Sequence, residues 1–355
     1  MSSVRNRRRS RYLGLPLCLI AAAALIFIFW RIESERQLST AEASPLATLV
    51  SSPEPIVSAE PTASAVATDV PSATPEPIAA PTASPVPTGL LGGKFADLFA
   101  SDSAATFNDK SYISDSAVLL FGEFYDPSSY SKKVTYFVID IYIRDIELLR
   151  TGCAYDDFNR SRIGYFDNIC SSYSALAAIN GDYYAFNNDG IVLRNGELYR
   201  KKLDGFNDVC VLFRNGEMAI YDTDKININE LLALDPWQVW DFGPSLLDDD
   251  GNAKSSFSSD YSGILSRNPR TAIGYFEPGH YCFVVADGRQ GSYSQGLSMS
   301  DLARLMQSLG CSIAYNLDGG QTSQMYWDDS TCNNPYHDGR ATSDIIYIAA
   351  SVPQS

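Results

Sequence analysis

The sequence predicts an α+β protein, in which a mixed, hairpin-rich β-sheet domain with few helices is preceded by one transmembrane helix and a disordered stalk. Three observations predict this arrangement. An uncharged apolar run lies near the N-terminus, a proline-rich segment follows it, and the remaining chain alternates short β-type runs with turn dipeptides. These features divide the 355 residues into a basic cytoplasmic tail (1–12), an anchor (13–30), a stalk (31–88) and one domain (89–355).

The anchor is predicted from Leu13 to Trp30, a run without a charged side chain. At about 1.5 Å per residue, a helix of this length crosses a hydrocarbon core of about 30 Å. Five arginines precede the run and both charge signs follow it, so the N-terminus is expected in the cytoplasm. The alternative is a cleaved signal peptide, but the run ends in Ile28, Phe29 and Trp30 and no A-x-A site directly follows it. We therefore expect a single-pass protein of the cell membrane that contacts lipid through residues 13–30 and carries its C-terminal domain outside the cell.

The stalk is predicted from composition. Residues 38–88 contain no Lys, Arg or aromatic residue, and they hold ten of the chain's 18 prolines. Such a segment cannot bury a hydrophobic core. Because proline stiffens the backbone toward extended polyproline geometry, we expect a spacer that holds the domain away from the membrane.

Charge and cysteine content narrow the classes of partner. The chain has a formal net charge of −15, and the acidic excess falls in the domain, which argues against nucleic acid as a partner. Six cysteines lie beyond the anchor without a C-x-x-C pair, and the chain has only two histidines, so a zinc site is not expected. Disulfides and buried free thiols both remain open for these cysteines.

The strands of the domain are predicted from runs of β-branched and aromatic residues, of which Val134 to Ile143 is the longest. Asn195-Gly196 and Asn215-Gly216 are the dipeptides that type I′ hairpin turns require, so each is predicted to close a hairpin of that type. A third hairpin is predicted at Pro278-Gly279.

One amphipathic helix is predicted from Ser300 to Leu309, where apolar residues recur at i, i+3, i+4 and i+7. Ser298 is predicted to cap its start and Gly310 to end it. A strand is predicted on each side of this helix. A right-handed strand–helix–strand unit would bring Asp287 and Asp318, which follow the two strands, to the same edge of the sheet.

Both of these carboxylates are followed by glycine, in Asp287-Gly288-Arg289 and Asp318-Gly319-Gly320. Glycine lets backbone N–H groups approach a phosphate without an intervening Cβ. Asn180-Gly181-Asp182 follows another apolar run, and Arg270 stands just before a strand, so these residues are also expected at strand ends. Plain turns and a solvated charge are the alternative interpretations of these motifs.

From about Tyr173 to Ile348, the chain resembles the phosphodiester glycosidase domain family. This family includes the lysosomal uncovering enzyme, N-acetylglucosamine-1-phosphodiester alpha-N-acetylglucosaminidase, and domains of bacterial exopolysaccharide-associated proteins. The resemblance is carried by five segments, which are Ala178–Tyr184, Phe242–Leu246, Pro269–Gly274, Asp287–Arg289 and Asn316–Gly320. The sequence departs from the family in placing Gln321 and Thr322 before Ser323, where the family usually continues with glycine and two serines.

The resemblance implies an enzyme, a phosphodiester glycosidase that cleaves a sugar-1-phosphodiester. It implies that two arginines grip the phosphate while two carboxylates act as base, nucleophile or oxocarbenium stabiliser. The catalytic residues expected on this basis are Asp318, Asp287, Arg270 and Arg289. The substrate-binding residues expected are Asn180, Gly181, Asp182, Thr271, Gly288, Asn316, Gly319, Gly320, Ser323 and Arg340.

The expected partner is a cell-surface glycan or a phosphate-containing polymer. No cofactor is required by these motifs, although the acidic groups could hold a divalent cation. Two alternatives stay open at this point. One is a non-catalytic surface module that binds polysaccharide through Tyr183, Tyr184, Trp327 and Tyr336, and the other is a sugar-phosphate transferase in exopolysaccharide or wall-polymer biosynthesis.

Overall fold

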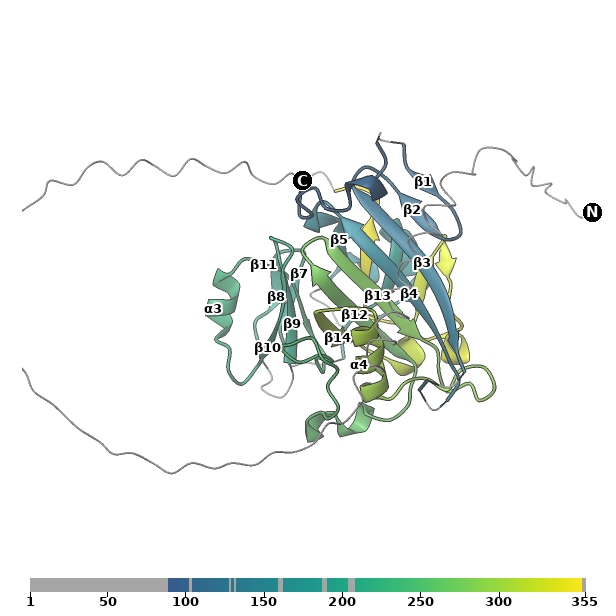
Figure 1. Ribbon diagram of the computed structural model, residues 1–355. Coiled ribbons are helices and arrows are strands. Elements are labelled where there is room, and N and C mark those ends of the chain that lie inside the picture. Colours follow the sequence, from purple (N-terminus) through teal and green to yellow (C-terminus); the bar gives the residue numbers. More distant parts are fainter. Residues whose placement is uncertain are drawn as a thin grey trace, which may run out of the picture. The chain divides into compact units, whose positions relative to one another are not determined.

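The computed structural model describes residues 89–101, 104–127, 129–130, 132–158, 162–186, 190–203 and 208–352, without the side chains of 259 and 260. The predicted anchor (13–30) and stalk (31–88) lie outside these residues. Within the described ranges, no helix is both long enough and apolar enough to cross a membrane. The described chain is mostly β-sheet with few helices (Figure 1), which confirms this part of the fold class predicted from the sequence.

Three sheets make up the described fold, and every strand pair in them is antiparallel. The first has the order β1 (Thr106–Phe107), β2 (Ser111–Ile113), β3 (Ala117–Asp126), β4 (Val134–Ile143), β13 (His280–Ala286), β12 (Arg270–Glu277), β14 (Ile313–Asn316). The second has the order β10 (Met218–Asp222), β9 (Asp208–Phe213), β11 (Pro236–Asp241), β7 (Val192–Arg194), β8 (Glu197–Arg200). The third has the order β16 (Ser330–Thr331), β15 (Met325–Trp327), β6 (Ala175–Asn180), β17 (Asp344–Ala349), β5 (Leu149–Cys153). The prediction of a mixed sheet is therefore wrong for the described strands.

The helices are short. Among the described residues, the α-helices are α2 (Phe166–Ser172), α3 (Ile228–Ala233) and α4 (Met299–Ser308). Short 3₁₀ helices in the same ranges are η1 (Ala96–Leu98), η2 (Ile146–Leu148), η3 (Ala154–Asp156), η4 (Ser259–Ile264), η5 (Gly320–Thr322) and η6 (Tyr336–Asp338). The helix predicted from Ser300 to Leu309 is α4, which begins and ends one residue earlier, and the predicted roles of Ser298 and Gly310 at its ends are confirmed. The Ser298 hydroxyl accepts a hydrogen bond from the Asp301 N–H, and Gly310 adopts a left-handed φ of +85° after the last turn.

The hairpin predictions have different outcomes. At Asn195-Gly196 both residues have positive φ, +52° and +81°, as a type I′ turn requires. At Asn215-Gly216 only the glycine does, with φ +84°, and the Phe213 N–H donates to the Glu217 carbonyl across a longer loop. The type I′ prediction is wrong there, because a three-residue loop needs only one left-handed residue. The hairpin at Pro278-Gly279 is confirmed between β12 and β13.

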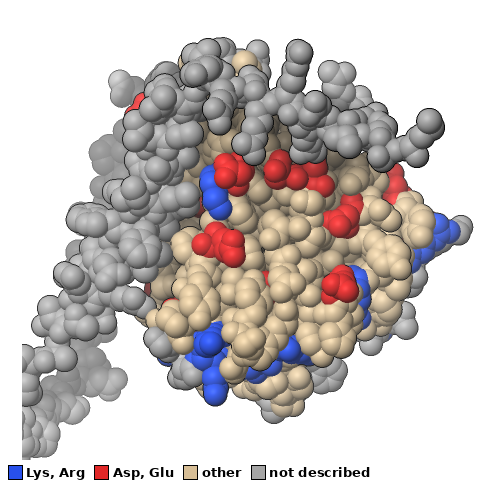
Figure 2. Space-filling model, turned by 90° about the vertical axis from the view of Figure 1, so that its right-hand side faces the viewer, with Lys and Arg blue, Asp and Glu red and all other residues tan. Residues whose placement is uncertain are grey.

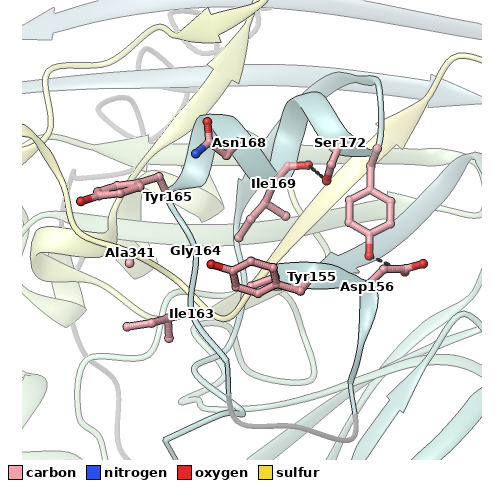
Figure 3. Close-up of a pocket in the computed structure, with 11 residues that line it drawn as sticks. Tyr155, Asp156, Ile163, Gly164, Tyr165, Asn168, Ile169, Ser172 and Ala341 are labelled. Carbon is pink, nitrogen blue, oxygen red and sulfur yellow. Dashed lines mark hydrogen bonds between the residues drawn. The ribbon is translucent and has the colours of Figure 1, made fainter.

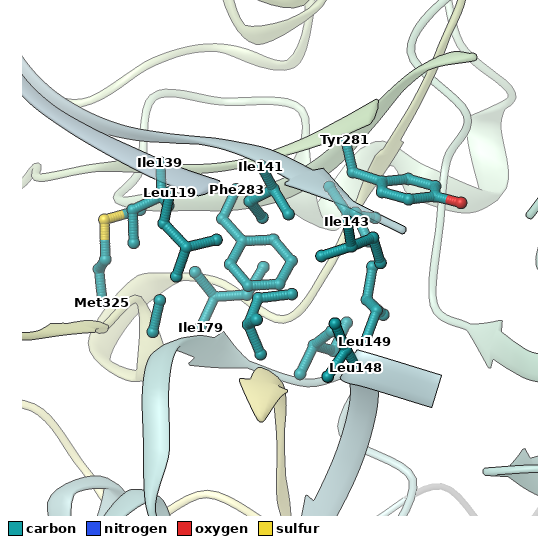
Figure 4. Close-up of a cluster of buried hydrophobic side chains, with 14 of the residues drawn as sticks. Leu119, Ile139, Ile141, Ile143, Leu148, Leu149, Ile179, Tyr281, Phe283 and Met325 are labelled. Atoms are coloured by element: carbon teal, nitrogen blue, oxygen red, sulfur yellow. The ribbon is translucent and has the colours of Figure 1, made fainter. Parts of the chain in front are cut away.

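The main core lies between the first and third sheets (Figure 4). Leu119, Ile139 and Phe283 of the first sheet are fully buried, and they belong to one cluster with Ile179 and Met325 of the third. These side chains alternate along their strands with residues that face the other way, which is the period-two pattern of a half-buried strand. Burial of this apolar surface holds the two sheets together.

The topology brings the predicted motifs to one edge. Because β13 and β14 both pair antiparallel with β12, which lies between them, they run in the same direction and end where β12 begins. Asp287 and Asp318 therefore follow strands that end at this edge, as predicted, and Arg270 lies between the two strand ends. The end of β6 joins them, since the Asp318 N–H donates to the Gly181 carbonyl at 3.2 Å. We call this region, formed by the ends of β6, β13 and β14 and the start of β12, the polar edge.

Charged side chains are unevenly spread on the face drawn in Figure 2. Most acidic groups lie in the upper and middle parts of that view, with a basic group among them, and most basic groups lie toward the lower part. The net charge of −15 is therefore not expressed as one uniform field on this face.

Gly274 of β12 leaves room for two thiols. The Cys282 and Cys311 Sγ atoms lie 3.7 Å apart above it, and the six described cysteines are all free. A Cβ on Gly274 would approach these two sulfur atoms to 2.7 and 2.6 Å, far inside normal contact.

Gly274→Ala is therefore expected to overpack the core and to lower the free energy of unfolding by about 1–3 kcal/mol. Gly263→Ala is the matched control, because nothing lies within 4 Å of its added Cβ, and it should change that free energy by less than about 0.5 kcal/mol. Urea unfolding of the full-length variants measures both. Equal stabilities for Gly274→Ala and the wild type would contradict the tight packing at this position.

Candidate active site

Asn180 is the hub of the polar edge. Its Nδ2 donates to the Asp318 carbonyl at 2.7 Å and to the Gly181 carbonyl at 3.3 Å. Its Oδ1 accepts from the Thr271 hydroxyl at 2.7 Å and from the Gln324 N–H at 3.3 Å. The amide is fully buried and all of its hydrogen-bonding capacity is used within the protein. Asn180 and Thr271, both predicted to bind substrate, therefore join the first sheet to the third.

Gly181 and Asp182 continue this arrangement inside the protein. A Cβ on Gly181 would lie 2.3 Å from the Asp344 carboxyl carbon, so only glycine fits beside that carboxylate. Both Asp182 oxygens accept from Arg194 Nη2 at 2.7 Å, and one also accepts from the Asp241 N–H. Asp182 and Arg194 are almost completely buried. This ion pair links β7 to the polar edge, and it keeps the Asp182 carboxylate away from solvent.

Asp344 is the residue of this cluster that the sequence analysis did not single out. Its Oδ1 accepts from the Ser343 hydroxyl, whereas its buried Oδ2 has no hydrogen-bond partner in the described part of the chain and lies 3.7 Å from Arg194 Nη2. Burial, followed by the nearby Asp182 carboxylate, raises the pKa of Asp344. The only sequence signal was its place directly before the apolar run 345–349, with which it forms β17.

Asp318 is the carboxylate of the polar edge that pairs with a partly exposed arginine. Its Oδ2 accepts from Arg340 Nη2 at 2.9 Å and from the Thr322 hydroxyl at 2.8 Å, and its Oδ1 accepts from the Gly319 N–H. Burial raises the pKa of Asp318, while Arg340 and these donors oppose the rise. The side chain of Arg340 is 36% exposed and that of Asp318 is 10% exposed, so this pair borders solvent. Thr322, where the sequence departs from the family pattern, contacts the carboxylate directly.

Asp287 is enclosed by hydrogen-bond donors. Asn333 Nδ2 donates to its Oδ1 at 2.7 Å, and the Asn334 N–H and the Tyr293 hydroxyl each donate to its Oδ2 at 3.0 Å. Burial raises the pKa of Asp287 to about 6, and the three donors act against that rise. With 1% of its surface exposed, Asp287 lies behind the surface and fixes the 333–334 loop.

Arg270 holds the neighbouring loops through backbone carbonyls. Its Nε donates to Leu297 at 3.0 Å, and its Nη2 donates to Ile264 and Ser266. Burial and then the positive charge of Arg289 lower the pKa of Arg270 to about 10. No carboxylate within the ranges that the structure describes forms a salt bridge with it, so it adds an uncompensated positive charge beneath the polar edge.

Arg289 is the exposed cation of the site. The Asn268 Oδ1 accepts from its Nε at 2.9 Å and from its Nη2 at 2.6 Å, which fixes the guanidinium. A Cβ on Gly320 would lie 3.4 Å from both terminal nitrogens, so the guanidinium rests against the backbone of the Asp318-Gly319-Gly320 turn. It also lies 5.5 Å from the ring centre of Tyr336. The role of Asn268 became visible only in the fold.

The remaining predicted residues line the same region. Gly288 and Gly319 allow close approach to the Asn268–Pro269 backbone, since added Cβ atoms would lie 2.6 Å from Pro269 N and 3.0 Å from Pro269 O. The buried Ser323 Oγ and Asn316 Oδ1 have no hydrogen-bond partner among the described residues. Unpaired buried polar atoms are rare in folded proteins and often mark functional sites.

The four aromatic residues considered as sugar platforms separate into two groups. Tyr184 and Trp327 are 5% and 2% exposed and belong to the core. Tyr183 lies under Arg340, with 5.4 Å between the guanidinium and the ring centre, and Tyr336 lies under Arg289. Tyr183 also stacks on Phe186. Two aromatic rings thus flank the two arginines of the polar edge.

The acidic groups do not form a cation site in the described residues, where no three side chains of His, Cys, Asp or Glu gather closely enough to hold a metal ion. Asp182, Asp287 and Asp318 instead each have their own protein partners.

Comparison with known proteins supports the sequence resemblance. The family model described as phosphodiester glycosidase matches residues 173–349. The SPbeta prophage-derived uncharacterized protein YomE of Bacillus subtilis (strain 168) is 28% identical over 182 residues, which cover 49% of this chain; the chain spans 28% of that relative's length.

Two solved structures resemble the fold. The zebrafish N-acetylglucosamine-1-phosphodiester alpha-N-acetylglucosaminidase catalytic domain, auto-inhibited by its pro-peptide, matches with a TM-score of 0.53 and 16% identity over 66% of this chain and 83% of that chain. A hypothetical protein from Synechocystis matches with a TM-score of 0.50 and 14% identity over 70% of this chain and 64% of that chain. At these identities the likeness concerns the fold alone.

The buried Asp182–Arg194 ion pair is expected to contribute more to the free energy of unfolding than an ion pair at the surface. Arg194→Met leaves a buried carboxylate without its cation and is expected to lower the free energy of unfolding by about 3–5 kcal/mol. Arg214→Met is the control, because the Arg214 side chain is 40% exposed and pairs only at the surface with Glu147 and Asp235; it should cost less than about 1 kcal/mol. Denaturant titration of the full-length proteins compares them, and equal losses would contradict the assignment.

The pKa of Asp287 makes stability depend on pH. Folding raises this pKa from 3.8 to about 6, so the native state holds the proton more tightly than the unfolded state. The Asp287 contribution is thus fully present below about pH 4 and is lost as the pH rises to about 6, a decrease of up to about 3 kcal/mol. Asp287→Asn should remove this decrease, and Asp249→Asn, at an exposed position, should retain it. Parallel pH profiles of unfolding free energy for the wild type and Asp287→Asn would contradict this origin.

Proposed function

Because residues 173–349 belong to the phosphodiester glycosidase family, we propose that this protein hydrolyses a sugar-1-phosphodiester in a cell-surface glycan or a related substrate. The observation that carries the proposal is the polar edge itself. There the Asp318 carboxylate is paired with Arg340, and the Arg289 guanidinium rests against Gly320, two residues further along the same turn. A carboxylate and two arginines at one edge of the sheet suit a substrate whose reacting carbon bears a phosphate.

The reaction breaks the bond between the anomeric carbon and the phosphate oxygen. The carbon develops positive charge, and the oxygen leaves with the bonding electron pair as a phosphate monoester. Asp318 can stabilise the positive carbon, attack it, or take a proton from the attacking water. Its low exposure strengthens each of these interactions, since the surrounding protein screens charge less than water does.

The arginines act on the leaving group. Arg289 is exposed, and Asn268 holds its planar guanidinium, so it can present paired N–H donors to phosphate oxygens with little loss of freedom. Arg270 lies beneath it and is fastened to carbonyls; its charge adds to the positive potential while its side chain positions the loops. We therefore assign phosphate contact to Arg289 and a positioning role to Arg270.

The location of the reaction follows from the predicted anchor and stalk. An anchor at 13–30 and a spacer at 31–88 would hold the domain outside the cell within reach of surface polymers. A fixed glycan is then a more natural substrate than a cytoplasmic metabolite.

Asp318→Asn is expected to lower kcat/KM for sugar release from glycosyl phosphodiesters by about 10²–10⁴-fold, because the amide cannot accept a proton or stabilise positive charge as a carboxylate does. Asp249→Asn, at an exposed position, should keep wild-type activity. The assay incubates full-length protein with purified wall polymer, capsule and nucleotide-sugar substrates and measures the released sugar.

Full activity of Asp318→Asn would refute its role, and wild-type binding without any release would favour the non-catalytic module. Running the assay with an acceptor glycan separates hydrolysis from transfer.

A further inference from the structure

A cavity of about 610 Å³ lies between α2 and the Ala154–Asp156 turn that follows β5. Figure 3 shows the Tyr165 ring at the start of α2 and the Tyr155 ring on the turn, with Gly164 between them. Ile163 and Ala341 lie on the same side of the cavity. None of these residues contributes to the reaction described above.

This cavity opens beside the polar edge. In the third sheet, Cys153 of β5 lies opposite Asp344 of β17, and Ile345 of β17 lies opposite Asn180 of β6. The chain after Cys153 and the chain before Asp344 therefore extend beyond the same edge as the Asn180 hub. Ala341 lines the cavity, and its neighbour Arg340 binds Asp318. A molecule in the cavity would thus lie next to the proposed reaction centre.

The walls combine exposed rings with polar groups. Tyr155 is 71% exposed, Tyr165 is 74% exposed and Ile163 is 43% exposed, so three large exposed apolar side chains meet at one cavity. Asp156 and Asn168 add a carboxylate and an amide. No lysine or arginine is among the described residues that line it, and the guanidinium of Arg162 lies 5.4 Å from the centre of the Tyr155 ring. A sugar offers C–H groups to the negative face of an aromatic ring and hydroxyls to such polar groups, so these walls suit a neutral sugar better than a phosphate.

The Tyr155 ring is presented by a fixed turn. Tyr155 and Asp156 both have left-handed backbone conformations, with φ of +65° and +54°, which non-glycine residues rarely adopt. The Tyr173 hydroxyl holds this turn by donating to Asp156 Oδ1 at 2.7 Å and by contacting the Cys153 backbone. A strained turn that is held from behind keeps the exposed ring in place for a ligand.

A second cavity, of about 410 Å³, shares Asp156 and Tyr173 with the first. Its walls are polar and include Arg150, Asn195 and Glu197. The two cavities adjoin across the Tyr173–Asp156 hydrogen bond, so together they offer room for more than one sugar unit.

We propose that the cavity between Tyr155 and Tyr165 is a carbohydrate subsite, which binds neutral sugar units next to the phosphodiester and selects an oligosaccharide or polymer over a single glycosyl phosphodiester. The contribution of this subsite to hydrolysis rests on the proposed function, whereas sugar binding to the cavity can be measured without any turnover.

The experiment measures binding of full-length protein to an array of neutral oligosaccharides that includes chitotetraose and maltotetraose, with calorimetric titration of the best ligand. Tyr155→Ala and Tyr165→Ala should each raise its Kd at least tenfold. Tyr155→Phe, which keeps the ring, and Tyr125→Ala, which removes a 58%-exposed tyrosine of β3, should change it less than twofold. Thermal unfolding checks that the alanine variants remain folded.

The same variants are then assayed on two substrates, a single-sugar phosphodiester and a polymer that contains the same bond. Tenfold loss of kcat/KM on the polymer alone is expected for the two alanine variants. The inference is overturned if no neutral oligosaccharide binds, or if binding is unchanged in both alanine variants. Hydrolysis with equal kcat/KM losses on both substrates would also overturn it while leaving the proposed reaction intact. Glycan binding that depends on Tyr155 and Tyr165, without hydrolysis of any phosphodiester, would instead remove the reaction and leave the subsite.

Discussion

The four hydrogen bonds of the buried Asn180 amide are the constraint on which the candidate site depends. They connect the end of β6 to the start of β12, to the carbonyl of Asp318 and to the segment that enters β15. A buried amide that lost one partner would leave an unpaired polar group, which costs about 1–3 kcal/mol. The network therefore fixes how the first and third sheets meet, and with it the position of Asp318.

At the polar edge, three buried carboxylates are each stabilised in a different way. Asp182 is neutralised by a buried arginine, Asp287 is surrounded by three hydrogen-bond donors, and Asp318 pairs with an arginine that reaches solvent. Burying an ionised carboxylate is costly unless it is paired or hydrogen-bonded. Of the three, only Asp318 is paired with a cation that also borders solvent, which is why it is the group best suited to meet a substrate. The two enclosed carboxylates hold the framework around it.

The sequence predicted a helix or strand correctly where the residues of that one segment determine its structure. The spacing of apolar residues and the cap at Ser298 predicted α4, and the β-branched run predicted β4 to the residue. The dipeptide Asn-Gly was not sufficient to predict the turn type of a hairpin, because the turn type also depends on the length of the loop. The same dipeptide forms a type I′ turn at Asn195 and a longer loop at Asn215.

The sequence alone determined the acidic composition, the β-rich fold with few helices and the family motifs, because these follow from composition and local pattern. It also predicted the convergence of Asp287 and Asp318 on one edge, because a helical connection between two strands of one sheet leaves both strands running in the same direction. It could not decide which motif residues face a substrate. Only the tertiary structure showed that Asn180 and Asp182 are occupied within the protein, that Asn268 fixes Arg289, and that Arg194 and Asp344 complete the cluster. Those roles depend on contacts between residues far apart in the chain, and the period of a single strand or helix carries no information about such contacts.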